Sequence, residues 1–233
     1  MYRSKRISLV IPCYNEEDGL NKLLQAKPLF VDEIIVVDNA STDATAQVAS
    51  KHGAKVVYEP KKGYGQAYLA GLPQATGDII VTLDGDDTYP MGEVEKLISL
   101  IVDDDCDFVS GNRYPLTNKN IQPVINQYAN WLISLLIRLL YSIRLADSQS
   151  GMMAFKRDIL KKILMFDTGM GFSQEIKIKA FTRKDLKCRE VWISYRLRVG
   201  EVKFKSINDG LRNLFSAIRL RIKLRFSRSS CLS

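Results

Sequence analysis

The acidic sequence Asp-Gly-Asp-Asp at residues 84–87 is the segment best suited to bind a metal ion. It follows the apolar run Ile79–Leu83, so Asp84 and Asp86 leave the end of an expected strand two residues apart. On an extended chain, residues two apart point to the same side. Two carboxylates that converge beside a glycine form a site for a hard cation, Mg²⁺ or Mn²⁺, which would bridge a diphosphate. The alternative is an acidic turn that caps the helix expected from Met91.

Two other segments carry groups that bind anions or polar ligands. The segment Lys61–Gly65 places two lysines and two glycines before an expected helix, where free backbone N–H groups attract anions. The alternative there is a flexible loop with a solvated lysine pair. Asp38 ends a second apolar run, and Ser41 or Thr42 caps the helix that follows. Capping leaves the Asp38 carboxylate unused, so Asp38 remains a candidate ligand residue.

Composition limits the chemistry that this chain can perform. The 233 residues, 46% of them apolar, are enough for one globular domain with its own core. The single histidine, His52, excludes a histidine-rich metal site, and the four separated cysteines form no metal-ligand or redox pair. No apolar leader precedes Ser8, so we expect a reduced, cytosolic protein. Carboxylates are therefore the side chains expected to act as acids, bases or metal ligands.

The net charge of +8 is concentrated near the C-terminus. Residues 196–228 contain ten Lys or Arg and two acids, which accounts for the whole excess, and the rest of the chain is balanced. A basic segment of this kind suits an anionic partner, whereas a diffuse basic surface would suit nucleic acid. We therefore expect an anionic membrane surface as a partner, and no nucleic acid.

Apolar strand runs alternate with helical patterns through the first half of the chain. The expected strands are Ile7–Ile11, Glu33–Val37, Lys55–Tyr58, Asp78–Leu83 and Asp107–Gly111. The expected helices are Glu16–Ala26, Thr42–Lys51, Gln66–Ala75 and Met91–Val102. This alternation predicts a three-layer α/β fold with a mainly parallel sheet. Ligands of such folds bind at the carboxyl ends of the strands, where the acidic and glycine-containing loops lie.

Two amphipathic stretches do not belong to this alternation. Val124–Leu145 has polar interruptions too frequent for a membrane span and is predicted to be an interfacial helix on a bilayer, or else a core or dimer helix. A second helix is expected over Ile207–Ile222, although Arg219–Phe226 alternates like a strand. Its apolar face comprises Leu211, Leu214, Phe215, Ile218 and Ile222.

Six motifs together resemble a known family. In chain order they are Pro12–Glu16, Val36–Asp43, Lys62–Gly65, Asp84–Asp86, Gly111–Tyr114 and Asp147–Gly151. They resemble family-two inverting glycosyltransferases of the GT-A fold, and are most similar to dolichyl-phosphate mannose synthases and polyprenyl-phosphate glucosyltransferases. The resemblance covers about residues 7–205. It implies a Rossmann-like GT-A domain over residues 1–205, followed by a basic amphipathic segment over residues 206–233.

The resemblance also implies roles for individual residues. The nucleoside would be held by Pro12, Tyr14, Glu16 and Asp38. Lys62 belongs to the glycine-containing motif beside the nucleotide. The ribose-diphosphate and the metal would be held by Asp84 and Asp86. Arg113 would bind a phosphate, and Glu175 matches an acid near the acceptor site. Arg198 and Lys203 match a basic loop that closes on phosphates. Asp86, Arg113 and Glu175 are therefore the expected catalytic residues.

Two departures from the family pattern concern ligand binding. Thr88 stands where the family commonly has a glutamine that completes the metal site, so the third metal ligand is open. The family's second phosphate-binding arginine has no counterpart within Gln122–Gln127.

The resemblance implies transfer of a hexose from a nucleotide diphosphate sugar, GDP-mannose or UDP-glucose, to polyprenyl phosphate. A phosphate acceptor is already anionic and needs no general base. A sugar-hydroxyl acceptor, the close alternative, would need a base such as Asp147 or Glu175. A nucleic-acid-binding module is the distant alternative, suggested by the pI near 9.3. We expect a peripheral protein on the cytoplasmic face of the membrane, with homo-oligomerisation left open.

Overall fold

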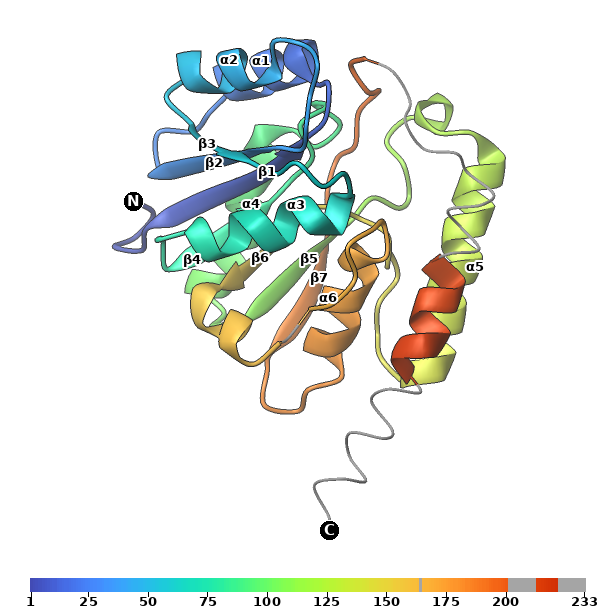
Figure 1. Cartoon of the computed structure of the whole chain (residues 1–233). Coiled ribbons are helices and arrows are strands. Elements are labelled where there is room, and N and C mark those ends of the chain that lie inside the picture. The colour runs from blue at the N-terminus through green and yellow to red at the C-terminus, as the bar shows by residue number, and fades with distance from the viewer. Residues whose placement is uncertain (164, 201–212, 222–233) are drawn as a thin grey trace.

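The computed structural model describes residues 1–163, 165–200 and 213–221, and its centre is a seven-stranded sheet (Figure 1). The strands are β1 (Ile7–Cys13), β2 (Glu33–Asp38), β3 (Lys55–Tyr58), β4 (Ile79–Thr82), β5 (Phe108–Asn112), β6 (Met153–Lys156) and β7 (Cys188–Trp192). Their order is β3-β2-β1-β4-β6-β5-β7. All neighbours pair in parallel except β6, which runs antiparallel between β4 and β5. The predicted mainly parallel α/β sheet is confirmed.

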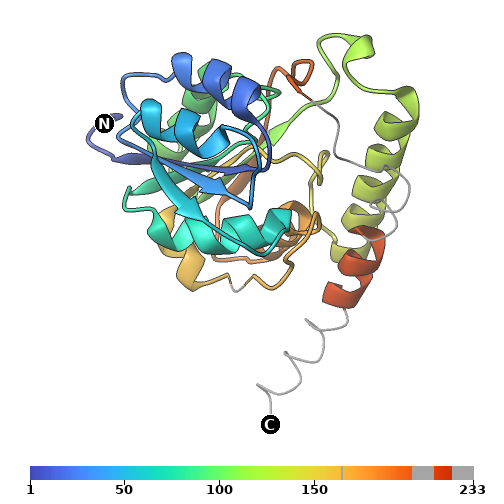
Figure 2. The ribbon, with the colours of Figure 1, turned by 45° about the horizontal axis from the view of Figure 1, so that its top comes forward.

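Helices cover both faces of this sheet. They are α1 (Glu17–Gln25), α2 (Thr45–Lys51), α3 (Tyr64–Gly71), α4 (Val94–Val102), α5 (Val124–Tyr141) and α6 (Phe172–Phe181). Short 3-10 turns occupy Leu72–Gln74, Met91–Glu93, Lys119–Ile121 and Arg157–Lys161. Figures 1 and 2 show α1 and α2 on one face and α3 on the other, while α5 stands beside the sheet. The layered arrangement leaves the carboxyl ends of β1, β2 and β4 at one edge.

The period-two pattern of the strands divides the core into two halves. On β1, Ile7, Leu9 and Ile11 join the cluster formed with α1, α2 and α4. Val10 points the other way, into the cluster formed with α3 and α6. Successive strand residues point to opposite faces, so a buried parallel strand needs apolar residues on both. The segment Ile7–Ile11 meets that need, because four of its five residues are apolar and the fifth, Ser8, is buried and hydrogen-bonded to Glu33.

A third apolar cluster lies outside the sheet and joins α5 to the helix at residues 213–221. Ile133, Ile137 and Tyr141 of α5 pack there against Ala217 and Leu220. Figure 1 shows the two helices side by side. Residues 219–221 are helical, so the strand alternative is wrong for them, whereas Leu211 and Ile222 lie outside the described residues. Of the described helices, none is long and apolar enough to cross a bilayer.

Three elements were not predicted from the sequence, namely β6, β7 and α6. β6, Met-Ala-Phe-Lys, pairs antiparallel with both of its neighbours, so it does not belong to the strand–helix alternation that identified the predicted strands. β7 is a partly exposed edge strand with charged residues. In α6, every residue from Phe172 to Ala180 is buried, including Lys177 and Lys179. A helix buried all round has no polar face, so it lacks the amphipathic pattern that identifies surface helices.

The close packing of α3 on the sheet generates a stability prediction. A Cβ atom added at Gly71 would lie 2.4 Å from Val37 Cγ2 and 3.0 Å from Val10 Cγ1. Gly71→Ala should therefore lower the free energy of unfolding by about 1–3 kcal/mol, as overpacking does. Gly92→Ala is the matched control, since a Cβ there meets nothing within 4 Å. Denaturant unfolding measures both; equal stabilities of the two variants would contradict this packing argument.

Candidate functional site

The acidic loop after β4 is held in place by two glycines. A Cβ at Gly85 would lie 2.5 Å from Cys13 Sγ of β1, and one at Gly19 of α1 would lie 2.8 Å from the Cα of Asp86. The absence of side chains at both positions lets β1 and α1 pack directly on the loop backbone. Asp84 and Asp86 are thereby fixed at the carboxyl edge of the sheet, as the motif predicts.

A cavity of about 280 Å³ opens beside this loop. Its charged lining consists of Asp84, Asp86, Arg113, Arg196 and Arg198. Its apolar lining comes largely from α5 and the segment before it, through Ile121, Pro123, Ala129 and Ile133. A site built in this way accommodates a ligand with both an anionic part and an apolar part.

The electrostatics of the acidic pair favour a cation. Burial and the neighbouring Asp86 carboxylate raise the pKa of Asp84 to about 7. The Tyr64 hydroxyl, which donates to Asp84 Oδ1 at 2.8 Å, and the charges of Arg113 and Arg198 offset part of this increase. A bound cation would stabilise both ionised carboxylates. Mg²⁺ typically takes one or two protein carboxylates and completes its shell with substrate phosphates and water. The donor set of Asp84 and Asp86 therefore fits Mg²⁺ or Mn²⁺.

Thr88 does not supply an obvious third metal ligand. Its hydroxyl and its backbone N–H both donate to Asp86 Oδ1, at 2.7 and 3.1 Å. The described residues contain no group of three or more His, Cys, Asp or Glu side chains that could hold a metal. Thr88 therefore orients the Asp86 carboxylate.

Arg198 reaches the acidic loop from the segment after β7. Its Nη1 lies 3.2 Å from Asp86 Oδ2, and its Nη2 donates to Glu16 Oε1. The guanidinium thus stands beside Asp86 as a positive charge. The backbone N–H of Val199 also donates to the Asp86 carbonyl at 3.0 Å, which holds this segment against the loop. The predicted phosphate-binding partner Lys203 lies outside the described residues.

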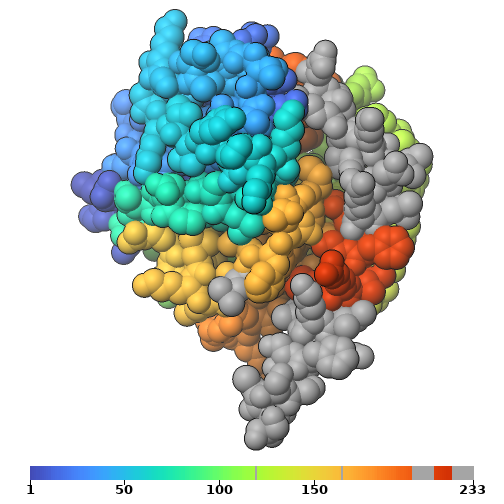
Figure 3. Space-filling view, in the orientation of Figure 1, coloured from blue at the N-terminus to red at the C-terminus, as the bar shows by residue number. Residues whose placement is uncertain are grey.

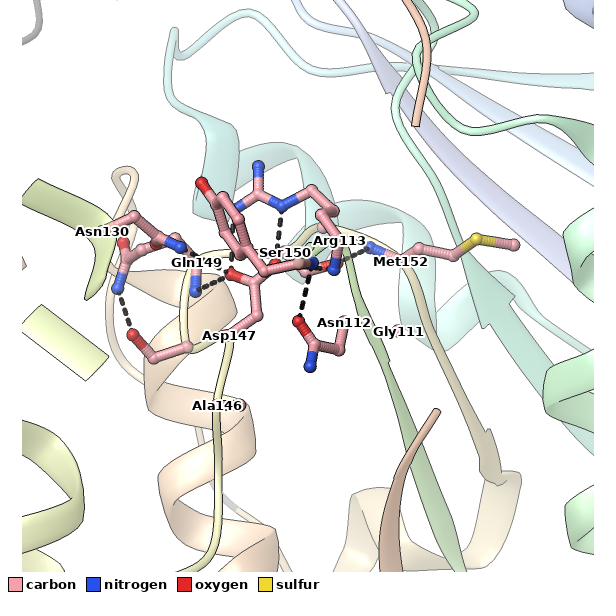
Figure 4. Close-up of polar contacts among 12 residues, drawn as sticks. Gly111, Asn112, Arg113, Asn130, Ala146, Asp147, Gln149, Ser150 and Met152 are labelled. Carbon is pink, nitrogen blue, oxygen red and sulfur yellow. Dashed lines mark hydrogen bonds and ion pairs between the residues drawn. The ribbon is translucent and has the colours of Figure 1, made fainter. Parts of the chain in front are cut away.

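Arg113 is held by a buried ion pair with Asp147 (Figure 4). Its Nε and Nη2 donate to the two carboxylate oxygens at 2.7 and 2.9 Å, and its backbone N–H donates at 3.1 Å. Asn130 of α5 donates to the same carboxylate at 3.1 Å. These partners hold the pKa of Asp147 well below its usual range, with Arg113 the largest lowering influence against the opposing effect of burial. Arg113 therefore lines the cavity in one fixed orientation.

The backbone of the loop that carries Asp147 is held by a buried lysine, Lys177, which we did not predict as a site residue. Lys177 of α6 donates from Nζ to the carbonyls of Asp147 and Ser150 at 3.0 and 2.6 Å. Burial lowers the pKa of this lysine to about 8. A lysine within an unrecognised buried helix gives no local signal, because its two acceptors lie 30 and 27 residues away.

The residues predicted to hold the nucleoside lie on the neighbouring loops. Lys62 Nζ donates to the Tyr14 hydroxyl at 2.6 Å, and Asp38 Oδ1 accepts from the Ser41 N–H at 3.0 Å. Asn39 holds the Lys62 loop by accepting from the Gly63 N–H at 2.7 Å. None of the predicted set Pro12, Tyr14, Glu16, Asp38 and Lys62 lines the cavity. The structure brings Tyr14 and Lys62 together. The nucleoside role of Pro12, Tyr14, Glu16 and Asp38 and the nucleotide-binding role of Lys62 remain predictions.

Glu175 is placed away from the cavity. Its Oε2 accepts from the backbone N–H groups of Phe166 and Asp167 at 3.1 and 2.7 Å, and its Oε1 accepts from Lys179 Nζ at 2.6 Å. Glu175 is not among the residues that line the cavity. The geometry therefore describes an acid that orders the loop before α6, and it provides no support for the predicted catalytic role.

The Arg113–Asp147 pair generates a prediction about stability. Asp147→Asn leaves a buried guanidinium without its counter-charge, so it should lower the free energy of unfolding by about 3 kcal/mol or more. Adding Arg113→Met should recover part of the loss, because the uncompensated charge is then removed. Urea unfolding of the two variants measures this difference. A double variant no more stable than Asp147→Asn would show that the ion pair is not the cause.

The effect of pH on this pair has a definite sign. The pKa of Asp147 is lower in the folded chain than in the unfolded chain, where it is about 3.9. The stabilisation is therefore complete well above pH 4 and is lost progressively as the pH falls from about 4 toward the lowered pKa of the folded chain.

Comparison with known proteins agrees with this geometry. The sequence model of glycosyl transferase family 2 matches residues 8–164, more than half of the chain. The low-salt glycan biosynthesis hexosyltransferase of Haloferax volcanii is 32% identical over 215 residues, which cover 89% of this chain and 52% of that protein. This chain thus spans about half the length of that relative. The dolichyl-phosphate hexose transferase of the same organism is 32% identical over 212 residues, covering 90% of this chain and 91% of that protein.

The fold also matches a solved glycosyltransferase structure. Glucosyl-3-phosphoglycerate synthase from Mycobacterium tuberculosis, solved with Mn²⁺, uridine diphosphate and glucosyl-3-phosphoglycerate, has a TM-score of 0.73 and 24% identity to this chain. The match covers 94% of this chain and 80% of that one. The predicted GT-A architecture is confirmed, and with it the family indicated by the six motifs: the chain belongs to glycosyl transferase family 2.

Proposed function

We propose that this chain transfers a hexose from a nucleotide diphosphate sugar to a polyprenyl phosphate, with inversion at the anomeric carbon. The observation that carries the proposal is the composition of the cavity. Its acidic pair and its three arginines suit a metal-bound diphosphate and an acceptor phosphate, and its apolar wall suits the first units of a prenyl chain. GDP-mannose and UDP-glucose are the donors to test first. The names of the two relatives from Haloferax volcanii support a hexose, and one of them supports a dolichyl phosphate acceptor.

The residues around the cavity would stabilise the departing nucleotide diphosphate. Asp84 and Asp86 would hold Mg²⁺ or Mn²⁺, which when bound offsets the negative charge of the diphosphate. Arg113, already fixed by Asp147, would contribute positive charge without rearranging. Arg198 would contribute a second positive charge once the cation and the diphosphate replace its carboxylate partners. Burial of the site strengthens these interactions, because less water screens them.

The state of the candidate bases argues for a phosphate acceptor over a sugar hydroxyl. A hydroxyl acceptor needs a carboxylate that accepts its proton. Asp147 is bound to Arg113 and its pKa is strongly lowered, while Glu175 is bound to Lys179 and lies off the cavity. An acceptor phosphate is already ionised at neutral pH and requires neither residue.

The surface next to the cavity is suited to a membrane. Eight large apolar side chains on α5 and the helix at 213–221 are each at least 41% exposed, namely Val124, Ile125, Tyr128, Trp131, Leu132, Leu139, Phe215 and Ile218. The packing of α5 against the second helix uses Ile133, Ile137 and Tyr141, so it leaves this other side of α5 uncovered. We propose that these eight residues, the apolar face, lie on the cytoplasmic surface of a bilayer. A group of exposed large apolar side chains on neighbouring helices is typical of a membrane or protein interaction site.

Transfer assays with the full chain test the proposed reaction. With Mn²⁺ and a short polyprenyl phosphate, either UDP-glucose or GDP-mannose should yield a hexosyl-polyprenyl phosphate. Asp86→Asn should lower the rate by about a hundredfold or more, because charge stabilisation at the diphosphate is lost. Asp103→Asn is the control, since that carboxylate pairs with Arg3 and does not line the cavity. Transfer to a sugar hydroxyl but to no phosphate would establish the alternative.

Vesicle sedimentation tests the apolar face. Wild-type protein should bind anionic vesicles, and part of that binding should survive high salt, which screens charges but does not weaken apolar insertion. Changing Trp131 and Leu139 to Ser should weaken the salt-resistant part about tenfold or more. Leu29→Ser is the control, because Leu29 is fully exposed but lies outside this face. Protein that stays in the supernatant at every lipid composition would contradict membrane attachment.

A further inference from the structure

Hydrogen bonds among Gln149, Gln174 and Asn213 form a closed ring at the cavity wall. Asn213 Nδ2 donates to Gln149 Oε1 at 2.7 Å, and Gln149 Nε2 donates to Gln174 Oε1 at 3.1 Å. Gln174 Nε2 completes the ring by donating to the backbone carbonyl of Asn213 at 2.5 Å. The ring joins the loop after α5, helix α6 and the helix at 213–221. Segments separated by 64 and 39 residues are thereby fixed at one place.

The ring sets the orientation of the Gln149 amide. Gln149 Nε2 donates to Ser148 Oγ at 2.8 Å as well as to Gln174, so both of its protons are used. Its Oε1 accepts from Asn213 and has a second lone pair. Gln149 and Asn213 both line the cavity, together with Ser173 and Tyr64. This part of the wall is uncharged and rich in hydrogen-bonding groups.

The chemistry of this wall differs from that of the rest of the cavity. The arginines and the acidic pair provide charges for phosphates and a cation. The Asn213 amide and the second lone pair of Gln149 Oε1 instead offer neutral hydrogen-bonding groups. Hexose hydroxyl groups are neutral and both donate and accept, so amides are their natural partners. We propose that Asn213 and Gln149 orient the hexose of the donor, and that the helix at 213–221 thereby takes part in sugar selection. This inference rests on the proposed function.

Asn213 is not needed merely to seat its helix. Ala217 and Leu220 pack into the cluster with α5, and the Tyr141 hydroxyl donates to the Ala217 carbonyl at 2.7 Å. Ser216 Oγ donates to Asp167 Oδ2 at 2.6 Å, a partner that does not belong to the ring. Figure 3 shows the helix against the segment that precedes α6. Because these contacts anchor the helix independently of the ring, docking and sugar binding can be separated by mutation.

The test compares binding of a nucleotide sugar with binding of the corresponding nucleotide diphosphate. The probes are UDP-glucose against UDP, and GDP-mannose against GDP, each with Mn²⁺ and the full chain. Asn213→Ala should weaken binding of the nucleotide sugar about fivefold, the loss of one or two hydrogen bonds, and leave the diphosphate unchanged. Gln149→Ala should do the same, and the double variant should show less than the sum of the two effects, because the residues act together.

Ser216→Ala is the matched control. It removes an anchor of the same helix without touching the ring, so it should change neither affinity. If Asn213→Ala weakens both ligands equally, or if Ser216→Ala reproduces its effect, the ring serves only to dock the helix and the inference is overturned. A wild-type chain that binds none of the four probes would overturn the proposed function itself. Asn213→Gln, which keeps the amide, should recover part of the selectivity and so excludes a folding defect as the cause.

Discussion

The buried pairing of Arg113 with Asp147 is the interaction on which the site depends. Neither charge can be left alone in the interior, since an unpaired buried charge costs several kcal/mol. The pair therefore ties the end of β5 to the loop after α5, and two more elements join it. Asn130 of α5 donates to the carboxylate, and Lys177 of α6 donates to the backbone of the same loop. The end of β5, the loop after α5, α5 itself and α6 are thus all joined through Asp147.

The other two arginines of the cavity also lie beside carboxylates, but in a way that ligands can exchange. Arg198 lies between the carboxylates of Asp86 and Glu16 and is only partly buried. Arg196 is half exposed and lies 3.6 Å from Asp87, beyond a normal hydrogen bond. A cation with a diphosphate presents both signs of charge, so it can replace these partners without leaving any group uncompensated. Arg113 is therefore a fixed charge, whereas Arg196 and Arg198 can move toward a bound substrate.

The two helices outside the sheet bring together surfaces of opposite character. α5 presents Asn130 and Ile133 to the cavity and Trp131 and Leu139 to the exterior. An acceptor with a phosphate head and an apolar tail needs such a boundary, because its two parts prefer different surroundings. The helix at 213–221 extends the same boundary and adds Asn213 to the cavity wall. Residues near the C-terminus, expected from the sequence to be a basic appendage, are therefore part of the site.

The sequence by itself determined the parts that depend on local pattern. Runs such as Ile7–Ile11 identify buried strands because side chains alternate along a strand, and the position of Asp84 and Asp86 after such a run places them at the edge of the sheet. The tertiary structure alone decided which charges meet. Asp147 and Glu175 look equally suited to act as bases, but one is bound to Arg113 and the other orders a loop. Their partners lie in other segments of the chain, and the periodic pattern of apolar residues does not predict which distant side chains meet when the chain packs.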